Sequence, residues 1–129
     1  MRQSLHAVTL VVPDYDEAIA FYTQTLSFSL LQDIDLGGGK RWVRIAPAGA
    51  QQGSLLLAQA NGPEQAAAIG NQTGGRVGFF LQTDDFQRDY TAMKAAGVTF
   101  EETPRHEPYG TVAVWRDPFG NRWDLIEFS

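Results

Sequence analysis

Hydrophobic and polar residues alternate near the start of the chain, over residues 5–12. One side of this pattern carries Val8, Leu10 and Val12, and the other side carries Ala7, Thr9 and Val11. A period of two residues is typical of a β-strand with one buried face. The pattern therefore predicts a half-buried strand at this position.

The period then changes from two residues to three or four. Asp14 and Glu17 have the spacing of a helix N-cap and its capping box. The apolar positions that follow lie on one helical face, namely Tyr15, Ala18, Ile19, Tyr22 and Leu26. This spacing predicts an amphipathic helix directly after the strand.

The same pattern occurs a second time, 71 residues further along the chain. At this offset Asp14 corresponds to Asp85, and "GKRWVRIAPAG" (39–49) matches "GTVAVWRDPFG" (110–120). The last strand of each copy matches at an offset of 68, because the first copy has three extra residues in its turn. A shared offset across a helix and a hairpin indicates an internal repeat.

Three strands are expected after each helix, so that the order βαβββ occurs twice. In the first copy these strands are predicted at residues 28–34, 41–46 and 53–59, and in the second at 98–103, 111–116 and 122–128. Residues 61–74 are rich in Ala, Gly, Asn and Gln and are predicted to link a module at 1–60 to a module at 75–129. We expect the 129 residues to form a single domain.

Composition excludes several classes of function. The net charge is −5 and there is no run of Lys or Arg, which argues against binding to nucleic acid or to an anionic membrane. The chain has no cysteine, so disulfides, thiolate zinc sites and cysteine nucleophiles are excluded. No apolar run is long enough to span a bilayer, and a cytoplasmic protein is expected.

Two motifs connect this repeat to a known family. The segment "VPDYDEAIAFYTQTLSF" (12–28) opens the first module and "DPFGNRWDLIE" (117–127) closes the second. This arrangement resembles the vicinal oxygen chelate superfamily, which includes glyoxalase I, bleomycin-resistance proteins and extradiol dioxygenases. The resemblance implies an α+β fold in which two tandem βαβββ modules form a curved mixed sheet that encloses a cup, with helices on the outer face.

Metal-dependent members of this superfamily hold a divalent ion at the floor of the cup. The resemblance places the four ligand positions at Ala7, Leu56, Gly78 and Asp124. His6 is one residue out of phase and faces the other way, and a shift of two residues at the third position gives only the cation Arg76. A single carboxylate is too few donors for zinc or a hard divalent ion. We therefore predict no metal and no cofactor.

The face expected to line the cup mixes apolar and polar side chains, as small-ligand pockets do. Its candidate ligand-binding residues include Arg76, Phe80, Gln82 and Asp124. Asp124 is the main candidate, because a carboxylate can bind or deprotonate a ligand group. Alternatively, Asp124 forms a structural salt bridge with Arg76 or Arg122.

Further candidates lie on a connecting segment and on a strand. The segment "TPRHEPYGT" (103–111) could overhang the cup, with His106 as an acid–base group and Tyr109 as a ligand-binding group. A solvated loop histidine is the alternative. In "RWVRIAP" (41–47), Trp42 and Arg44 share one face, and Trp42 could stack on a ligand, or instead belong to the core or to a dimer interface.

These observations predict a metal-independent protein that binds a small organic molecule in the cup. The resemblance also implies a homodimer, because members of the superfamily commonly pair modules between chains. Alternatively, the protein is a glyoxalase-type or dioxygenase-type enzyme, with a non-standard metal site or with acid–base catalysis by Asp124 and His106.

Overall fold

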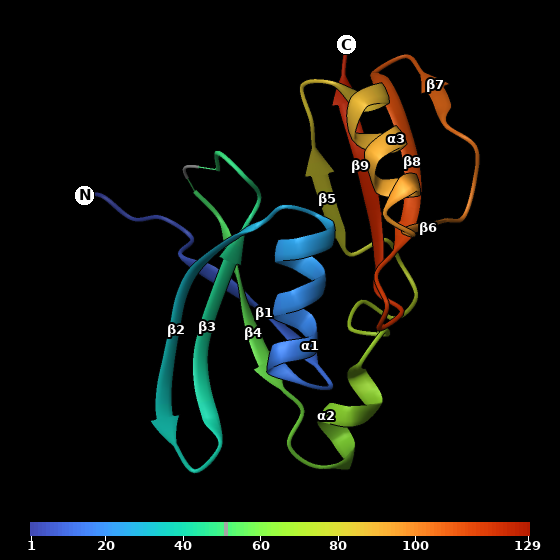
Figure 1. Cartoon of the computed structure of the whole chain (residues 1–129). Helices are drawn as coiled ribbons and strands as arrows, with labels where there is room; N and C mark the ends of the chain where they lie inside the picture. Colours follow the sequence, from blue (N-terminus) through green and yellow to red (C-terminus); the bar gives the residue numbers. More distant parts are fainter. Residues whose placement is uncertain (51) are drawn as a thin grey trace. The chain divides into compact units, whose positions relative to one another are not determined.

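The computed structural model describes residues 1–50 and 52–129 of the chain. These residues form two compact units, Met1–Ile69 and Gly70–Ser129, each with its own β-sheet (Figure 1). Within each unit a strand is followed by a helix and then by further strands, as the internal repeat predicts. The α+β fold of tandem βαβββ modules is confirmed, while the module boundaries at residues 60 and 75 stay a prediction.

The sheet of the first unit has four strands. Their spatial order is β1 (Ala7–Val12), β4 (Ser54–Gln59), β3 (Lys40–Ala46) and β2 (Ser29–Gly37), with β1 parallel to β4 and the other pairs antiparallel. Helix α1 (Tyr15–Ala20) continues into the π-helical turn η1 (Phe21–Thr25) and lies over one face of the sheet (Figure 1). Asp14 caps α1 as predicted, since its side chain accepts a hydrogen bond from the backbone N of Glu17 at 2.8 Å.

The core of the first unit lies between this sheet and α1. Leu10, Val43 and Leu57 come from three different strands and are fully buried, together with Tyr22 from η1. Val43 and Leu57 are direct cross-strand neighbours, so their side chains project from the same face. Burial of this apolar surface stabilises the unit and orients the remaining side chains of the strands toward the opposite face.

Two connections in the first unit are informative. Gly38 and Gly39 both have positive φ and form the two-residue turn between β2 and β3, as is common in β-hairpins. The predicted linker contains an additional helix, α2 (Pro63–Ala68), which the sequence analysis did not predict. Its signal is Pro63 in the first turn followed by good helix formers. Among the described residues, no helix has the length and apolarity required to cross a bilayer.

The sheet of the second unit has the order β5 (Phe79–Gln82), β9 (Arg122–Phe128), β8 (Gly110–Arg116) and β6 (Thr99–Phe100), and β7 (Arg105–Glu107) also pairs with β8. Helix α3 (Phe86–Ala95) covers one face of this sheet (Figure 1). Asp85 caps α3 by accepting a hydrogen bond from the backbone N of Arg88 at 3.1 Å. The same capping device therefore begins the main helix of both units.

Aromatic rings dominate the core of the second unit. The rings of Trp115 and Trp123 stack with centroids 5.0 Å apart, and Phe79 stacks on Trp123 at 4.9 Å. Phe86 and Met93 of α3 are buried as well. Stacked pairs of this kind add to the stabilisation that their buried area already supplies.

The strand predicted at 98–103 and the loop predicted at 103–111 are both corrected. The strand contains only Thr99 and Phe100, and the supposed loop contains β7 and a tight turn. The carboxylate of Glu102 accepts a hydrogen bond from the backbone N of Val114 at 2.9 Å, in place of a main-chain partner. Pro104 has no N–H to donate to a ladder, which also favours the interruption.

The register also corrects one detail of the repeat. Leu56 lies opposite Arg44 in the first unit, and Asp124 lies opposite Val114 in the second. By its place in the register, Arg44 therefore corresponds to Val114 and not to Trp115. The offset between these two strands is one residue shorter than the 71 residues that the sequence repeat predicts.

Each sheet has a face opposite its main helix, which we call its open face. That of the first sheet carries Thr9, Gln32, Trp42, Arg44, Ser54 and Leu56, and that of the second carries Phe80, Gln82, Val112, Val114, Asp124 and Ile126.

Candidate functional site

Asp124 lies in the middle of the open face of the second sheet. It is on β9, with Phe80 of β5 on one side and Val114 of β8 on the other. The side chain is half-buried, and its Oδ1 atom is buried with no hydrogen-bond partner among the described residues. An unpaired buried acceptor costs free energy, so a donor that binds to this half-buried carboxyl would offset that cost.

The surroundings of Asp124 change its acidity. Burial is the largest cause and raises the pKa of this carboxyl above its ordinary value. Arg105 and Arg122 lower the pKa and Glu102 raises it, but the net direction is upward. The structure therefore disfavours the ionised form of the carboxyl unless something binds to it.

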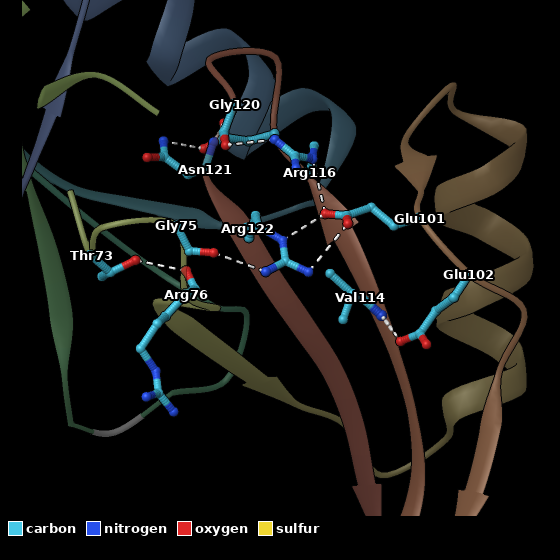
Figure 2. Close-up of polar contacts among 11 residues, drawn as sticks. Thr73, Gly75, Arg76, Glu101, Glu102, Val114, Arg116, Gly120, Asn121 and Arg122 are labelled. Carbon is cyan, nitrogen blue, oxygen red and sulfur yellow. Dashed lines mark hydrogen bonds and ion pairs between the residues drawn. The ribbon is translucent and has the colours of Figure 1, made fainter. Parts of the chain in front are cut away.

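The two arginines near Asp124 are already paired with other carboxylates. Arg122 donates to Glu101 from Nε at 2.9 Å and from Nη2 at 3.2 Å, and its Nη1 donates to the carbonyl of Gly75 at 3.0 Å (Figure 2). Arg105 donates to Glu102 and to Glu107, both at 2.9 Å. These ion pairs leave the carboxylate of Asp124 without a salt bridge in the described part of the chain.

The structural alternative for Asp124 is therefore wrong for both partners that the sequence suggested. Figure 2 shows Arg122 directed at Glu101, which Arg116 also contacts at 2.9 Å. The side chain of Arg76 is exposed and extends away from this cluster. Glu101 is the residue that the sequence analysis missed, because its role depends on β6 bringing it beside two arginines distant in sequence.

His106 does not lie beside Asp124. It is on β7 opposite Thr111, whose own neighbour is Glu127, so these side chains project from the helix-covered side of the sheet. Glu127 accepts a hydrogen bond from the backbone N of Phe86, which confirms that side. The His106 ring is exposed, and its Nδ1 lies 3.3 Å from the hydroxyl of Thr111. Joint acid–base catalysis by His106 and Asp124 does not fit this geometry.

The remaining candidate residues lie on the open face of the second sheet, in the turn between β7 and β8, and, for Trp42, in the first unit. Phe80 and Gln82 share the open face with Asp124, and the side chain of Phe80 is 65% exposed. Tyr109 is in the turn between β7 and β8. Hydrogen bonds to Glu102 and Glu107 are the main causes that raise the pKa of Arg105, and the Tyr109 hydroxyl makes a smaller contribution in the same direction. The aromatic ring of Phe80 is thus available beside the unpaired carboxylate oxygen.

Trp42 belongs to the first unit, on the open face of its sheet. Its Nε1 donates to Oε1 of Gln32 at 3.0 Å, and the same oxygen accepts from Nε of Arg44 at 2.6 Å. The ring is half-buried and lies on the side of the sheet away from α1, outside the helix-side core. Arg44 and Gln32 are site residues that the sequence analysis did not assign, although Arg44 shares a face with Trp42.

The donor set expected for the superfamily's metal does not fit a divalent ion. Ala7 and Leu56 in the first unit and Gly78 in the second offer no side-chain donor, which leaves Asp124 alone. Within residues 1–50 and 52–129, no group of three or more His, Asp or Glu side chains could hold a metal ion. His6 is exposed and precedes β1, and its carbonyl accepts a hydrogen bond from Ser54 at 2.7 Å.

Comparison with known proteins agrees with this architecture. The chain is 51% identical over 130 residues to an uncharacterized protein of Shewanella frigidimarina (strain NCIMB 400), with 100% of this chain and 96% of that protein covered. Its fold is similar to that of UcmS2, with a TM-score of 0.83, 33% identity and 98% of each chain covered. It is also similar to TnmS3, an antibiotic binding protein from Streptomyces sp. CB03234, with a TM-score of 0.73, 32% identity and 100% of each chain covered.

The family-level comparison covers almost the whole sequence. Residues 4–125 match the model of the Glyoxalase/Bleomycin resistance protein/Dioxygenase superfamily. This span includes both units, both capped helices and Asp124. The chain therefore belongs to the glyoxalase/bleomycin resistance protein/dioxygenase superfamily.

Proposed function

We propose that this protein binds a small organic molecule at the open face of its second sheet, without a metal ion. The observation that carries the proposal is the half-buried carboxyl of Asp124, whose Oδ1 atom has no hydrogen-bond partner among the described residues. The similarity to an antibiotic binding protein supports a ligand of that general size and class.

The residues around Asp124 indicate which chemistry would bind. The half-buried carboxyl can accept a hydrogen bond from an N–H or O–H of the ligand, and it favours a cationic donor because the carboxylate would then remain ionised. Phe80 supplies exposed apolar surface beside the carboxyl and can stack on a planar or cationic group, whereas Val114 on the other side is buried. The net charge of −5 is compatible with a cationic ligand.

The small number of possible metal ligands supports the proposed metal independence. A divalent ion bound by Asp124 alone would lack the further protein ligands that zinc requires. In this proposal Asp124 acts directly on the ligand. The raised pKa of Asp124 also suits proton transfer, so a glyoxalase-type or dioxygenase-type reaction is the second candidate function, with Asp124 as its acid–base group.

The other expectations about partners stay predictions. We propose a homodimer on the resemblance alone, and we propose a cytoplasmic protein that does not bind nucleic acid. Ion pairs occupy Arg105, Arg116 and Arg122 on the second unit, which leaves little free positive charge there for phosphates.

Thermal-shift and calorimetric titrations with cationic aromatic antibiotics test this function, with uncharged analogues of each compound alongside. We expect Asp124→Asn to weaken binding of the cationic compound about tenfold, because a charge-assisted hydrogen bond becomes a neutral one. Glu64→Gln on α2 is the control, since it removes one negative charge far along the chain from this site.

Elemental analysis of protein purified without chelators completes the test. We expect much less than one metal ion per chain and unchanged ligand binding in the presence of a chelator. One bound ion per chain that disappears in Asp124→Ala would contradict metal independence. Equal affinity of wild type and Asp124→Asn for every ligand would contradict the assignment of the site.

A further inference from the structure

Arg44 differs from the other partly buried arginines of the chain. Most arginines are paired with a carboxylate at 2.6–3.0 Å, namely Arg41, Arg88, Arg105, Arg116 and Arg122. Arg2 and Arg76 are exposed. Arg44 is half-buried, and among the described residues no acidic side chain forms a salt bridge with it. A buried charge without a counter-charge is unfavourable unless other groups compensate it.

Neutral groups hold the guanidinium of Arg44 in place. Its Nε donates to Oε1 of Gln32 at 2.6 Å, and its Nη1 donates to Oγ of Ser54 at 3.1 Å. The Ser54 hydroxyl donates in turn to the carbonyl of His6 at 2.7 Å, so its oxygen is left to accept from Arg44. Trp42 donates to the same oxygen of Gln32 at 3.0 Å, which fixes the orientation of that amide.

This network orients the guanidinium and uses only part of its hydrogen-bonding capacity. The remaining N–H groups, on Nη1 and Nη2, have no hydrogen-bond partner among the described residues. An arginine that is already held in one orientation loses little conformational freedom when it binds an anion. Its free N–H groups are therefore available to a planar oxyanion.

Arg44 also lines a pocket within the first unit. The pocket has a volume of about 340 Å³, within the usual range for small-molecule sites. Its described lining residues include no Asp or Glu, and they combine the apolar side chains of Leu5, Leu31 and Ala46 with the polar Ser54. Arg41 on the same strand pairs with Asp33 on the opposite face of the sheet, so Asp33 does not compensate Arg44.

We infer that this pocket is a binding site for a small organic carboxylate, whose oxygens accept hydrogen bonds from Arg44. The apolar walls would contact the hydrocarbon part of the acid, and the guanidinium would supply the charge and the geometry. This site is in the first unit, uses none of the residues of the proposed Asp124 site, and selects the opposite ligand charge. It does not depend on the function proposed for Asp124.

Titration of ¹⁵N-labelled protein with benzoate tests this inference, with benzamide as the uncharged analogue of the same shape. We expect benzoate to shift the Arg44 Nε–H signal and the backbone amide signals of His6 and Ser54. Benzamide should bind at least about tenfold more weakly, because it lacks the charge. Equal binding of benzamide, or no shift of these signals at any benzoate concentration, would overturn the inference.

Variants of the full chain identify the residue responsible. Arg44→Gln should lose benzoate binding, while Arg88→Gln removes the same charge from α3 and should leave it unchanged. If Arg44→Gln does not fold, Arg44→Lys keeps the charge without the planar group and should bind benzoate several-fold more weakly than wild type. Wild-type affinity in Arg44→Lys and Arg44→Gln, or equal loss in Arg88→Gln, would contradict the assignment.

Inorganic phosphate distinguishes a carboxylate site from a general anion site. Phosphate cannot fill the apolar part of the pocket, so we expect it to bind more weakly than benzoate and to compete with it. Tighter binding of phosphate than of benzoate would overturn the assignment to organic acids.

Discussion

The two units have the same scaffold and place opposite charges on it. On the open face of the first sheet, Arg44 of β3 lies beside Leu56 of β4. At the corresponding positions of the second sheet, Val114 of β8 lies beside Asp124 of β9. Each pair thus consists of one half-buried charged residue and one aliphatic residue. In the first unit the charge is positive and lies on β3, whereas in the second it is negative and lies on β9, which corresponds to β4.

The internal repeat preserves the helix-covered side of each sheet, but the residues of the two open faces differ. The capped helix and the buried strand positions recur in both units, because the helix must pack on the sheet in either copy. The open face does not pack against that helix, so helix packing does not determine which residues it carries. The two proposed sites therefore differ in chemistry, with a donor or cation proposed to bind at Asp124 and an anion at Arg44.

The largest effect we expect comes from Gly110→Ala, which is directed at the second unit alone. Gly110 has a φ of +153°, and a Cβ atom here would clash with the carbonyl oxygen of Glu127 on β9. We expect a loss of about 2–4 kcal/mol of stability in the second unit. Hydrogen exchange measures it residue by residue and shows whether the first unit keeps its protection.

Gly38→Ala is the matched control for this prediction. Gly38 also has positive φ, at +64°, but a Cβ atom there meets no atom within 4 Å. We expect a loss of only about 1 kcal/mol, restricted to the β2–β3 hairpin. An equal loss from both substitutions would show that conformational strain, and not the clash with Glu127, determines the effect.

Leu56→Asp introduces a carboxylate in the first unit at the position that corresponds to Asp124 in the second. The new carboxylate would lie beside Arg44, as Asp124 lies beside Val114, and would supply a counter-charge that no described residue gives Arg44. We expect benzoate affinity to fall by tenfold or more, on the order of 1.4 kcal/mol, because the carboxylate competes for the guanidinium. The titration described for Arg44 measures the change.

Leu56→Asn separates charge from shape at that position. It introduces a polar side chain of the same size without a negative charge, and benzoate should still bind within a few-fold of wild type. Equal losses in the two variants would mean that the apolar surface of Leu56, and not the free charge of Arg44, determines benzoate affinity.

A smaller effect is expected when Asp124 is replaced by Asn. The pKa of Asp124 is raised above its ordinary value of 3.8, so the native state binds this proton more tightly than the unfolded state does. Stability from this group is present below pH 3.8 and is lost as the pH rises through the folded pKa. Asp124→Asn removes the cost of the ionised form and should raise stability at pH 7 by about 0.5–1 kcal/mol.

Urea denaturation of both proteins as a function of pH measures this difference. The gain should be greatest at neutral pH and should disappear in acid, where the carboxyl of the wild type is protonated. A variant that is less stable than wild type at pH 7 would mean that the ionised carboxylate has a stabilising partner in solution.

The smallest effect is expected from Glu101→Gln. Hydrogen bonding to Arg122 is the largest cause of the lowered pKa of Glu101, followed by the opposing effect of burial. Its stabilising contribution is present above the ordinary value of 4.5 and is lost as the pH falls through the folded pKa. We expect Glu101→Gln to cost about 0.5–1 kcal/mol at pH 7, since the pair is partly exposed to solvent.

Acid denaturation of the same variant checks the direction. Between pH 5 and pH 3, roughly the range in which an ordinary glutamate titrates, its stability should change less than that of wild type. An unchanged pH profile would show that other carboxylates determine the acid sensitivity of the second unit.

Much of the fold could be predicted from local pattern. The alternation over residues 5–12, the caps at Asp14 and Asp85 and the turn at Gly38 and Gly39 all depend on neighbours in the sequence. The sequence also predicts that Phe80 and Asp124 share one face, and the pairing of β5 with β9 makes them direct neighbours. Period and capping chemistry suffice where the interactions are short-range.

The errors occur where distant residues meet. The strand predicted at 98–103 is interrupted because Glu102 accepts a hydrogen bond from Val114. The one-residue change in the offset between β3 and β8 follows from pairing with β4 and β9, which a sequence match cannot detect. The prediction that His106 acts together with Asp124 assumes that the segment around His106 is a loop. In the structure this segment contains β7, and its register directs the His106 side chain to the helix-covered face of the sheet.

Local sequence pattern predicts the duplicated βαβββ order, the capped helices and the small number of possible metal ligands, because period, capping chemistry and residue type are local properties. That Asp124 forms no salt bridge and Arg44 has no carboxylate partner among the described residues is visible only in the tertiary structure. The reason is that an ion pair depends on which strands are neighbours. Glu101 is paired with Arg122, and Gln32 with Arg44, by sheet registers that join residues far apart in the chain.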